Sequence, residues 1–209
     1  MDIATIIILL MAYLLGSIPF AMVASKLFDL PDPRTYGSKN PGATNVLRSG
    51  KIAAAVVTLL GDAGKGWLAV ELTRAYVSME GGGYELISGA ALLVFLGHLF
   101  PIFLNFKGGK GVATAAGVLL GFNVLLGSLV ILTWIIVAAI SRLSSLSALT
   151  AAVLAPIYSY LIFDWDTPVW VVIIISLLLM LRHRANIINL IEGKETRIGK
   201  KAANKTKVC

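Results

Sequence analysis

Long apolar stretches separated by short polar ones run along nearly the whole chain. A stretch of about 20 apolar residues forms a helix long enough to cross the roughly 30 Å hydrocarbon core of a bilayer. The apolar stretches are residues 3–24, 52–76, 84–105, 112–140, 146–163 and 168–181. The pattern therefore predicts an all-α, polytopic integral membrane protein. We expect a single transmembrane domain over residues 1–209, with no separate soluble domain.

The number of spans depends on residues 112–140, which contain Gly121, Phe122 and Asn123 near their middle. Read as one helix, this stretch gives six spans; read as two short helices, it gives seven. Only the seven-span arrangement brings the most basic segments to one face. These segments are residues 25–51, 105–111, 141–145 and 182–209, and they hold 16 of the 18 Lys and Arg residues. The positive-inside rule places that face in the cytoplasm, so we expect seven helices, an outside N-terminus and a basic cytoplasmic tail from about residue 182.

Composition narrows the class of protein further. The chain is 57% hydrophobic and 14% charged, whereas a soluble domain carries roughly a quarter charged residues. Its net charge is +7, and the basic residues gather on the face predicted to be cytoplasmic. This placement favours anionic lipids or anionic substrates, rather than nucleic acid, as partners. Cys209 is the only cysteine and no metal-ligand cluster is visible, so we expect no metal and no cofactor. Without a G-x-S-x-G elbow, an enzyme of this sequence is not expected to form a covalent intermediate.

The segment N-F-K-G-G-K-G at residues 105–111, which we call the glycine–lysine loop, combines two lysines with three glycines and precedes a helical pattern. Glycines allow several N–H groups to point at one place, and a helix N-terminus and lysine charges add to the attraction for anions. The segment therefore predicts a phosphate site made by Lys107, Gly108, Gly109, Lys110 and Gly111. The helix that follows has only about ten residues before its break, roughly 15 Å, so we expect the loop to re-enter the membrane and line a cavity. The alternative is a basic turn that only fixes topology.

Two further polar segments lie on the same predicted face. Residues 36–50 lack acidic side chains, and their Arg48 can grip a phosphate with two parallel N–H bonds. The other hydrogen-bonding candidates there are Ser38, Asn40, Thr44 and Asn45. After the last span, topology alone explains the two arginines beside His183. It explains neither Asn186 nor His183, whose side chain can titrate near neutrality. The alternative for residues 36–50 is an ordinary hydrophilic loop, and the alternative for His183 is a structural histidine.

Charged residues also occur inside the predicted spans. Such charges are costly, and they usually face the protein interior in pairs. Glu71 and Arg74, three residues apart, are interpreted as a structural ion pair. Asp62 and Lys65, also three apart, fit either structural support or the site itself. His98, near the cytoplasmic end of its span, fits either a core histidine or a side chain that orients the glycine–lysine loop.

Taken together, these segments closely resemble the bacterial acyl-phosphate:glycerol-3-phosphate acyltransferases of the PlsY type. The matching motifs are G-S-K-N-P-G-A-T-N-V-L-R from Gly37, D-A-G-K-G from Asp62, G-H-L-F-P-I-F-L-N-F-K-G-G-K-G-V-A-T from Gly97, and R-H-R-A-N-I from Arg182. The last motif continues to Gly193 and Glu195. Two positions depart from the family pattern: Ala185 replaces an acidic residue often found there, and Lys39 stands where glycine is common.

The resemblance implies seven spans in the bacterial inner membrane and an active site on the cytoplasmic face. It implies transfer of a fatty acyl group from acyl phosphate to the 1-hydroxyl of glycerol 3-phosphate, giving lysophosphatidic acid and phosphate for phospholipid synthesis. It also implies functional coupling to an enzyme that produces acyl phosphate. The rival interpretations are an organic-phosphate carrier or channel, because transporters also use broken helices, and a non-catalytic lipid-binding protein.

Within this resemblance, each candidate residue receives an expected role. We expect Ser38, Asn45, Arg48, Lys107 and Lys110 to hold phosphate groups, with the backbone of residues 108–111 completing the cradle. We expect His183 and Asn186 to orient the attacking hydroxyl or to stabilise the developing oxyanion. The supporting residues are Asn40, Gly42, Asp62, Lys65, His98, Ser145 and Glu195.

Overall fold

The computed structural model describes residues 2–199, and within that range it contains helices and no strand. The helices of the bundle are α1 (Ile3–Ser17), α4 (Ile52–Glu80), α5 (Tyr84–Leu99), α6 (Val112–Phe122), α7 (Val124–Ser141), α8 (Ser144–Phe163) and α9 (Thr167–Arg182). The shorter elements are α2 (Phe20–Leu27), α3 (Ala43–Leu47), the 3-10 helix η1 (Ile102–Leu104) and α10 (Arg184–Ile191). The expectation of an all-helical fold is confirmed.

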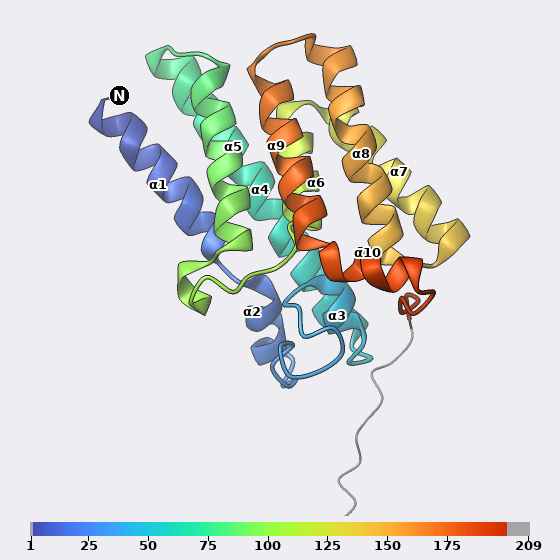
Figure 1. Cartoon of the computed structure of the whole chain (residues 1–209). Helices are drawn as coiled ribbons and strands as arrows, with labels where there is room; N and C mark the ends of the chain where they lie inside the picture. The colour runs from blue at the N-terminus through green and yellow to red at the C-terminus, as the bar shows by residue number, and fades with distance from the viewer. Residues whose placement is uncertain (1, 200–209) are drawn as a thin grey trace, which may run out of the picture.

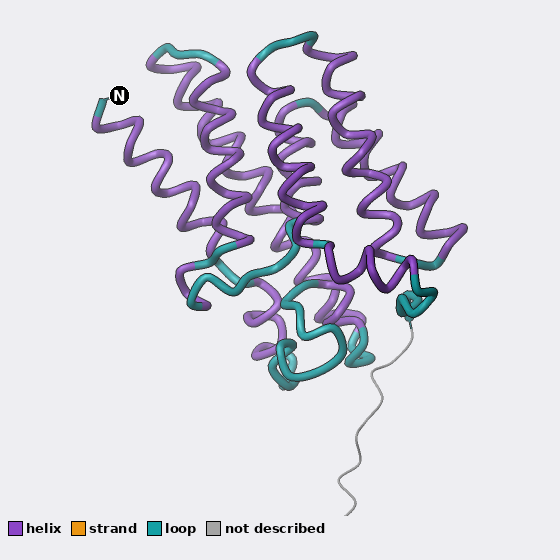
Figure 2. The backbone as a smooth tube through the Cα atoms, in the orientation of Figure 1, coloured by secondary structure: helices purple, strands orange, loops and turns teal. Residues whose placement is uncertain are grey.

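Successive helices of the bundle run in alternating directions (Figure 1). The N-terminal end of α1 lies at the same end of the molecule as the α4–α5 and α8–α9 turns. Most of the irregular backbone gathers at the opposite end, together with α2, α3 and α10 (Figure 2). Segments far apart in sequence therefore meet at this second end, which we call the loop end.

Length and composition identify four helices that could each cross a membrane by themselves. These are α4, α7, α8 and the segment Tyr84–Leu104, which combines α5 with η1. Two bent pairs, α1 with α2 at 43° and α9 with α10 at 59°, would raise the count to six. Helix α6 has only 11 residues, about 16 Å at 1.5 Å per residue, which is too short to cross alone. Seven spans remain a prediction.

Two predicted breaks are confirmed at the level of the backbone. Helix α1 ends at Ser17 and α2 begins after Pro19, which lacks an N–H for helix bonding. The 112–140 stretch divides at Asn123, whose side-chain oxygen accepts hydrogen bonds from Leu125 N and Leu126 N and so caps α7. Two helices, the short α6 and the 18-residue α7, therefore occupy this stretch in place of one long helix.

Some predicted boundaries were wrong. Helix α4 continues to Glu80 instead of ending near Tyr76, because residues 77–80 contain neither Gly nor Pro and the first such residue beyond Tyr76 is Gly81. The predicted end of the third span near Asn105 agrees with the span Tyr84–Leu104; within it, Pro101 ends the α-helix after Leu99 and η1 continues the span. The segment after Arg182 was predicted only as a basic tail, but it first forms helix α10 and then continues without a helix to residue 199. Residues 200–209 of the predicted tail, including Cys209, lie outside the described residues.

The short helix α6 is surrounded by other helices. It contacts α4, α5, α7 and α9, and its approach to α4 is close enough that a Cβ on Gly66 or Gly117 would overlap backbone atoms of the partner helix. Small residues of this kind allow membrane helices to pack backbone against backbone. At the far end of α6, the Arg74 guanidinium donates to the carbonyl oxygens of Gly121 and Phe122 and pairs with Glu71 Oε1 at 2.6 Å. Arg74 thereby satisfies carbonyls that the end of α6 leaves open.

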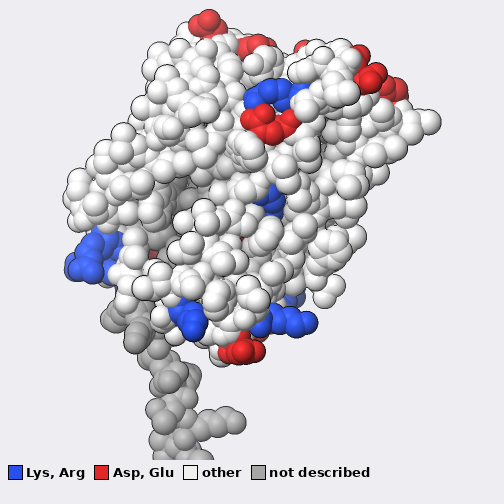
Figure 3. All heavy atoms as spheres, turned by 180° about the vertical axis from the view of Figure 1, so that it is seen from behind, with Lys and Arg blue, Asp and Glu red and all other residues white. Residues whose placement is uncertain are grey.

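The outer surface of the bundle is apolar. Large side chains that are at least half exposed occur on several of its helices, including Leu10 of α1, Leu60 of α4, Leu132 of α7, Leu161 of α8 and Leu177 of α9. A surface of this kind is expected of helices that face lipid. In Figure 3, acidic side chains gather at the end opposite the loop end, whereas basic side chains predominate near the loop end. The distribution of charge follows the pattern expected from sequence.

Candidate active site

A cavity of about 510 Å³ opens among three segments that are far apart in sequence. The first segment contributes Arg34, Ser38, Lys39, Asn40 and Pro41; the second contributes Phe106, Lys107, Gly108 and Lys110; the third contributes Arg182, Ala185, Asn186 and Asn189. Five of these lining side chains are cationic and none is acidic. The cavity is therefore suited to anions, and it brings together side chains from each of the three polar motifs.

Arg182, at the end of α9, fixes the glycine–lysine loop. Its Nη2 donates to Gly108 O at 2.8 Å and to Gly109 O at 3.0 Å, and its Nε donates to Gly109 O at 3.1 Å. The N–H groups of Gly108 and Gly109 donate to Leu99 O and His98 O, each at 3.2 Å. These two N–H groups are thus engaged within the protein in this structure, and their bonds hold the loop against the end of α5. A phosphate cradle that includes the backbone of residues 108–111 stays a prediction.

Lys110 connects the loop to α10. Its ammonium group donates to Asn186 Oδ1, and Asn186 Nδ2 donates in turn to Glu195 Oε1 at 2.8 Å. The pKa of Lys110 is lowered to about 8, chiefly by burial, with Arg48 and Arg182 lowering it further and Glu195 opposing the change. Lysine in such a setting is held in place and remains protonated at neutral pH.

Arg48 lies at the C-cap of the short helix α3 and is half-buried. Burial lowers the pKa of its guanidinium, and the nearby carboxylate of Glu195 opposes that effect. Glu195 thus lies near enough to influence both Arg48 and Lys110, so residues 36–50, the glycine–lysine loop and the segment after α10 come together at the loop end. Arg48 itself does not line the cavity. An arginine keeps its charge under these conditions.

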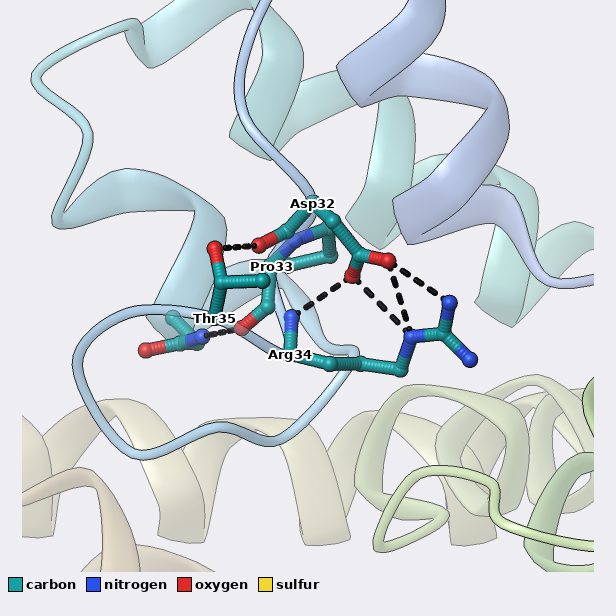
Figure 4. Close-up of polar contacts among 5 residues, drawn as sticks. Asp32, Pro33, Arg34 and Thr35 are labelled. Atoms are coloured by element: carbon teal, nitrogen blue, oxygen red, sulfur yellow. Dashed lines mark hydrogen bonds and ion pairs between the residues drawn. The ribbon is translucent and has the colours of Figure 1, made fainter.

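The loop that carries Ser38 is organised by Asn45. The Asn45 side chain is 2% exposed, its Nδ2 donates to Pro33 O at 2.6 Å and Tyr36 O at 3.3 Å, and its Oδ1 accepts from Ser38 N at 2.9 Å. Just before this loop, Asp32 receives both the backbone N–H and the guanidinium of Arg34 (Figure 4). Because its amide is engaged inside the protein, Asn45 shapes the loop in this structure and does not project into the cavity.

His183 lies at the bend between α9 and α10 and is only 3% exposed. Its Nδ1 is 2.8 Å from Leu179 O, and because a carbonyl oxygen can only accept, Nδ1 carries the proton. Burial, together with the charges of Lys110 and Arg182, lowers the pKa of His183 to about 4, although the bond to Leu179 opposes this. The imidazole is therefore neutral at physiological pH, with an unprotonated Nε2, and it does not line the cavity.

A buried polar network lies behind the glycine–lysine loop. Lys65 Nζ pairs with Asp62 Oδ1 at 2.8 Å and donates to Ile18 O at 2.7 Å, where the α1–α2 break leaves a carbonyl open. His98 Nδ1 lies 3.4 Å from the same Asp62 oxygen. A Cβ on Gly109 would overlap the His98 ring, so this network and the loop are in direct contact.

The remaining supporting residues occupy different places. Asn40 lines the cavity, and Gly42 begins α3 by accepting the N–H groups of Asn45 and Val46 at 3.0 Å. Ser145 is 4% exposed near the start of α8, and its hydroxyl has no hydrogen-bond partner among residues 2–199. Within the described residues as a whole, no group of three or more His, Cys, Asp or Glu side chains comes together as a metal site.

Comparison with known proteins assigns the chain to a family. Residues 6–193 match the sequence profile described as "Glycerol-3-phosphate acyltransferase", which is most of the chain. The chain belongs to the glycerol-3-phosphate acyltransferase family. Proteins named glycerol-3-phosphate acyltransferase from Nitrosomonas eutropha and Nitrosomonas europaea are 66% and 64% identical to it, and both alignments cover 94% of this chain and 98% of the relative.

The fold is also similar to that of a solved member of the glycerol-3-phosphate acyltransferase family. The crystal structure of PlsY (YgiH), described as an integral membrane glycerol 3-phosphate acyltransferase in its glycerol 3-phosphate form, superposes with a TM-score of 0.87 at 34% identity. The match covers 94% of this chain and 96% of that one. The form described with lysophosphatidic acid gives a TM-score of 0.85. The expected resemblance is therefore confirmed.

Several residues of this candidate site were missed from sequence. Arg182 was attributed to topology, although it makes the bonds that fix the glycine–lysine loop. Arg34, Phe106 and Asn189 line the cavity without having been singled out. Asn189 had a detectable signal, because it lies three residues after Asn186 and so on the same face of a helix. Arg34 had none beyond its positive charge.

Proposed function

We propose that this membrane acyltransferase transfers a fatty acyl group from acyl phosphate to the 1-hydroxyl of glycerol 3-phosphate, giving lysophosphatidic acid and inorganic phosphate. The observation that supports it most strongly is the single cavity lined by cations from three distant segments, with no acidic residue in its lining. Each of the two substrates carries a phosphate group, and so does each of the two products, so a site for this reaction must neutralise more than one phosphate.

The chemistry requires positioning rather than a covalent intermediate. Acyl phosphate is a mixed anhydride, and its carbonyl carbon is already activated. The 1-hydroxyl oxygen bonds to that carbon, the bond from the carbon to the phosphate oxygen breaks, and the hydroxyl proton leaves with the phosphate. A phosphate oxygen of the donor can take this proton directly. The contribution of the protein is then to hold two anions so that hydroxyl and carbonyl meet, which can lower the barrier substantially.

We assign phosphate binding to Arg48, Lys107 and Lys110, with Ser38 as an additional donor. The N-terminus of α6, which begins with Gly111 as its cap, directs its positive end toward the same loop. Asn45, Gly108 and Gly109 act as positioning residues, because their polar groups are bonded within the protein. Glu195 holds Asn186, and through it Lys110, in place.

Asn186 and His183 are the residues that we place nearest the chemistry. Asn186 lines the cavity and has a second N–H on Nδ2, which can donate to the oxyanion as the carbonyl is attacked. A neutral His183 cannot donate from Nε2, so it suits accepting a bond from the hydroxyl rather than stabilising the oxyanion. Because His183 is buried, contact with the hydroxyl requires a small rearrangement at the α9–α10 bend.

We place residues 1–209 as one unit in the bacterial inner membrane, with seven spans, an outside N-terminus and the loop end in the cytoplasm. The concentration of positive charge at the loop end supports this orientation. The contacts of α6 with four helices support counting it as a seventh, partial span. The acyl chain would lie along the apolar outer surface, in lipid. The donor, acyl phosphate, must come from a reaction that attaches a fatty acyl group to phosphate, which implies coupling to such an enzyme.

The test uses purified full-length protein in detergent with acyl phosphate and glycerol 3-phosphate. The proposal predicts that phosphate and lysophosphatidic acid appear in equal amounts, and that omitting either substrate stops lysolipid formation. A second arm uses sealed vesicles with labelled glycerol 3-phosphate outside. Movement of label into the vesicles without any lysolipid would instead identify a carrier and overturn the proposal.

A further inference from the structure

The cavity has two parts that differ in how its cations are held. Lys110 is bonded to Asn186, and Arg182 is bonded to the carbonyls of Gly108 and Gly109. Arg34, Lys39 and Lys107 also line the cavity, but all three are exposed. They therefore form the outer, solvent-facing part of the cavity. Of the three, only Lys107 has been given a role above; Arg34 and Lys39 have none.

The backbone at Lys39 is unusual for its residue type. Its φ is +56°, in the left-handed region that glycine adopts readily and that residues with a Cβ adopt only with strain. Of the six described non-glycine residues with positive φ, three are Asp or Asn, which tolerate this region; the others are Lys39, Phe106 and Arg142. Lysine thus stands where glycine would fit without strain, and where the resembling family commonly has glycine.

The loop around Lys39 is fixed in this conformation by the rest of the protein. Lys39 N donates to Tyr36 O at 2.9 Å, and the preceding Ser38 N donates to the buried Asn45 side chain at 2.9 Å. The Lys39 side chain lines the cavity from this position. A strained residue whose side chain faces a binding cavity indicates that the side chain contributes something which offsets the strain.

Arg34 is held beside the same opening. Its Nε and Nη2 bind the Asp32 carboxylate at 2.6–3.0 Å, while Nη1 has no partner among residues 2–199 (Figure 4). Asp32 offsets much of the Arg34 charge but leaves this N–H pair for a ligand. The net positive charge of the outer part therefore comes mainly from Lys39 and Lys107.

We propose that Arg34, Lys39 and Lys107 form an outer subsite that captures a phosphate group at the mouth of the cavity, before or after its stay at the inner phosphate positions. The inference rests on the proposed function and deepens it. Clustered exposed cations raise the local concentration of anions, and this effect weakens as salt is added. The phosphate could belong to incoming glycerol 3-phosphate, to the headgroup of acyl phosphate or to departing inorganic phosphate.

The experiment separates the charge of Lys39 from its backbone strain. Lys39→Met removes the charge and keeps the strain, Lys39→Gly removes both, and Lys39→Arg keeps both. We expect kcat/KM for glycerol 3-phosphate at low ionic strength to fall about fivefold in the Met and Gly variants and to stay near wild type in the Arg variant. The difference should shrink in high salt. Only Lys39→Gly should raise the thermal midpoint, by roughly 2–4 °C.

The control is Lys26→Met, which removes an exposed lysine of α2 that does not line the cavity. Parallel measurements of KM for acyl phosphate and of inhibition by inorganic phosphate show which phosphate the subsite holds. If only the kinetics with glycerol 3-phosphate change, the subsite holds the acceptor. If only KM for acyl phosphate changes, it holds the donor, and if only inhibition by inorganic phosphate changes, it holds the product. Equal kinetics of wild type and Lys39→Met for all three ligands would overturn the inference. Failure of wild type to make lysolipid would instead overturn the proposed function.

Discussion

The ammonium group of Lys110 bonds to the amide oxygen of Asn186, which is 76 residues further along the chain. This bond joins the glycine–lysine loop before α6 to the helix after the last bundle helix. Asn186 in turn bonds to Glu195 at 2.8 Å, so a third position helps to place the lysine. The geometry of the anion site therefore depends on where α9 ends and α10 begins.

The lowered pKa of Lys110 predicts an alkaline limit to activity. Burial lowers this pKa to about 8, so the charge that binds phosphate is lost as pH rises above 8. We expect kcat/KM for glycerol 3-phosphate to decline above about pH 8 in wild type. Lys110→Arg keeps its charge and should remove this decline, even if its overall activity is lower. An identical decline in both proteins would show that another group titrates.

The same shift makes a separate prediction about stability. Between about pH 8 and the ordinary lysine value of 10.5, the unfolded chain binds the Lys110 proton and the folded protein does not. Stability attributable to Lys110 should therefore rise with pH across that window, in the opposite direction to activity. Thermal midpoints of wild type and Lys110→Arg, measured from pH 7.5 to 10.5, check this. The contrary result is a wild-type midpoint that falls relative to that of the arginine variant.

His183 should make the protein sensitive to mild acid. Its pKa in the folded protein is about 4, against an ordinary value of 6.5, so only the unfolded chain takes up its proton between these values. Stability should then fall as pH drops from 6.5 to 4, by a total of about 3 kcal/mol. His183→Gln does not titrate and should show a shallower loss in a thermal-midpoint series. Parallel curves for the two proteins would contradict a neutral, buried His183.

The buried pair of Asp62 and Lys65 should behave as a coupled unit. Lys65→Met leaves the Asp62 carboxylate buried with His98 alone, which should destabilise the fold by roughly 3–5 kcal/mol. Replacing both residues, with Asp62→Leu and Lys65→Met together, removes the uncompensated charge and should recover part of the loss. Thermal midpoints of the two single variants and the double variant give the coupling. Additive losses would mean that the pair is not an energetic unit.

The contact of Gly109 with His98 predicts a strict requirement for glycine. A Cβ at Gly109 would overlap the His98 ring, so Gly109→Ala must displace either the loop or the histidine. We expect kcat/KM to fall at least about tenfold, because small displacements of positioned groups strongly reduce rate. Gly64→Ala is the matched control, since nothing lies within 4 Å of a Cβ there. Similar activities of the two variants would remove the positioning role of Gly109.

The fold was predictable where the sequence carries local signals. Apolar length identified the spanning helices, and Pro19 and Asn123 marked real breaks because each interrupts or caps a helix by its own chemistry. The end of α4 was missed because helix ends depend on tertiary contacts as well as on local sequence. Helix α10 was missed because it is short and follows directly on a basic segment that topology already explained.

The residue types of the candidate site could be predicted from sequence, but their hydrogen-bond partners could not. Sequence identified Lys110, Asn186 and Arg48 as polar groups on one face; the structure places Lys110 and Asn186 in one cavity, with Arg48 nearby at the same end of the molecule. It could not show that Asn45 and the glycine N–H groups are engaged within the protein, because a sequence does not reveal which polar groups already have partners. For the same reason, Arg182 was taken for a topological charge rather than the group that fixes the loop.

The most direct test of the account compares turnover of the charge-neutral variants Arg48→Gln and Lys110→Gln with that of wild type. Each is assayed with acyl phosphate and glycerol 3-phosphate after folding is verified by size-exclusion elution and thermal midpoint. If these two side chains grip phosphate in one site, each folded variant should form lysophosphatidic acid at least about 100-fold more slowly than wild type. Near-normal turnover in both folded variants would contradict the central claim.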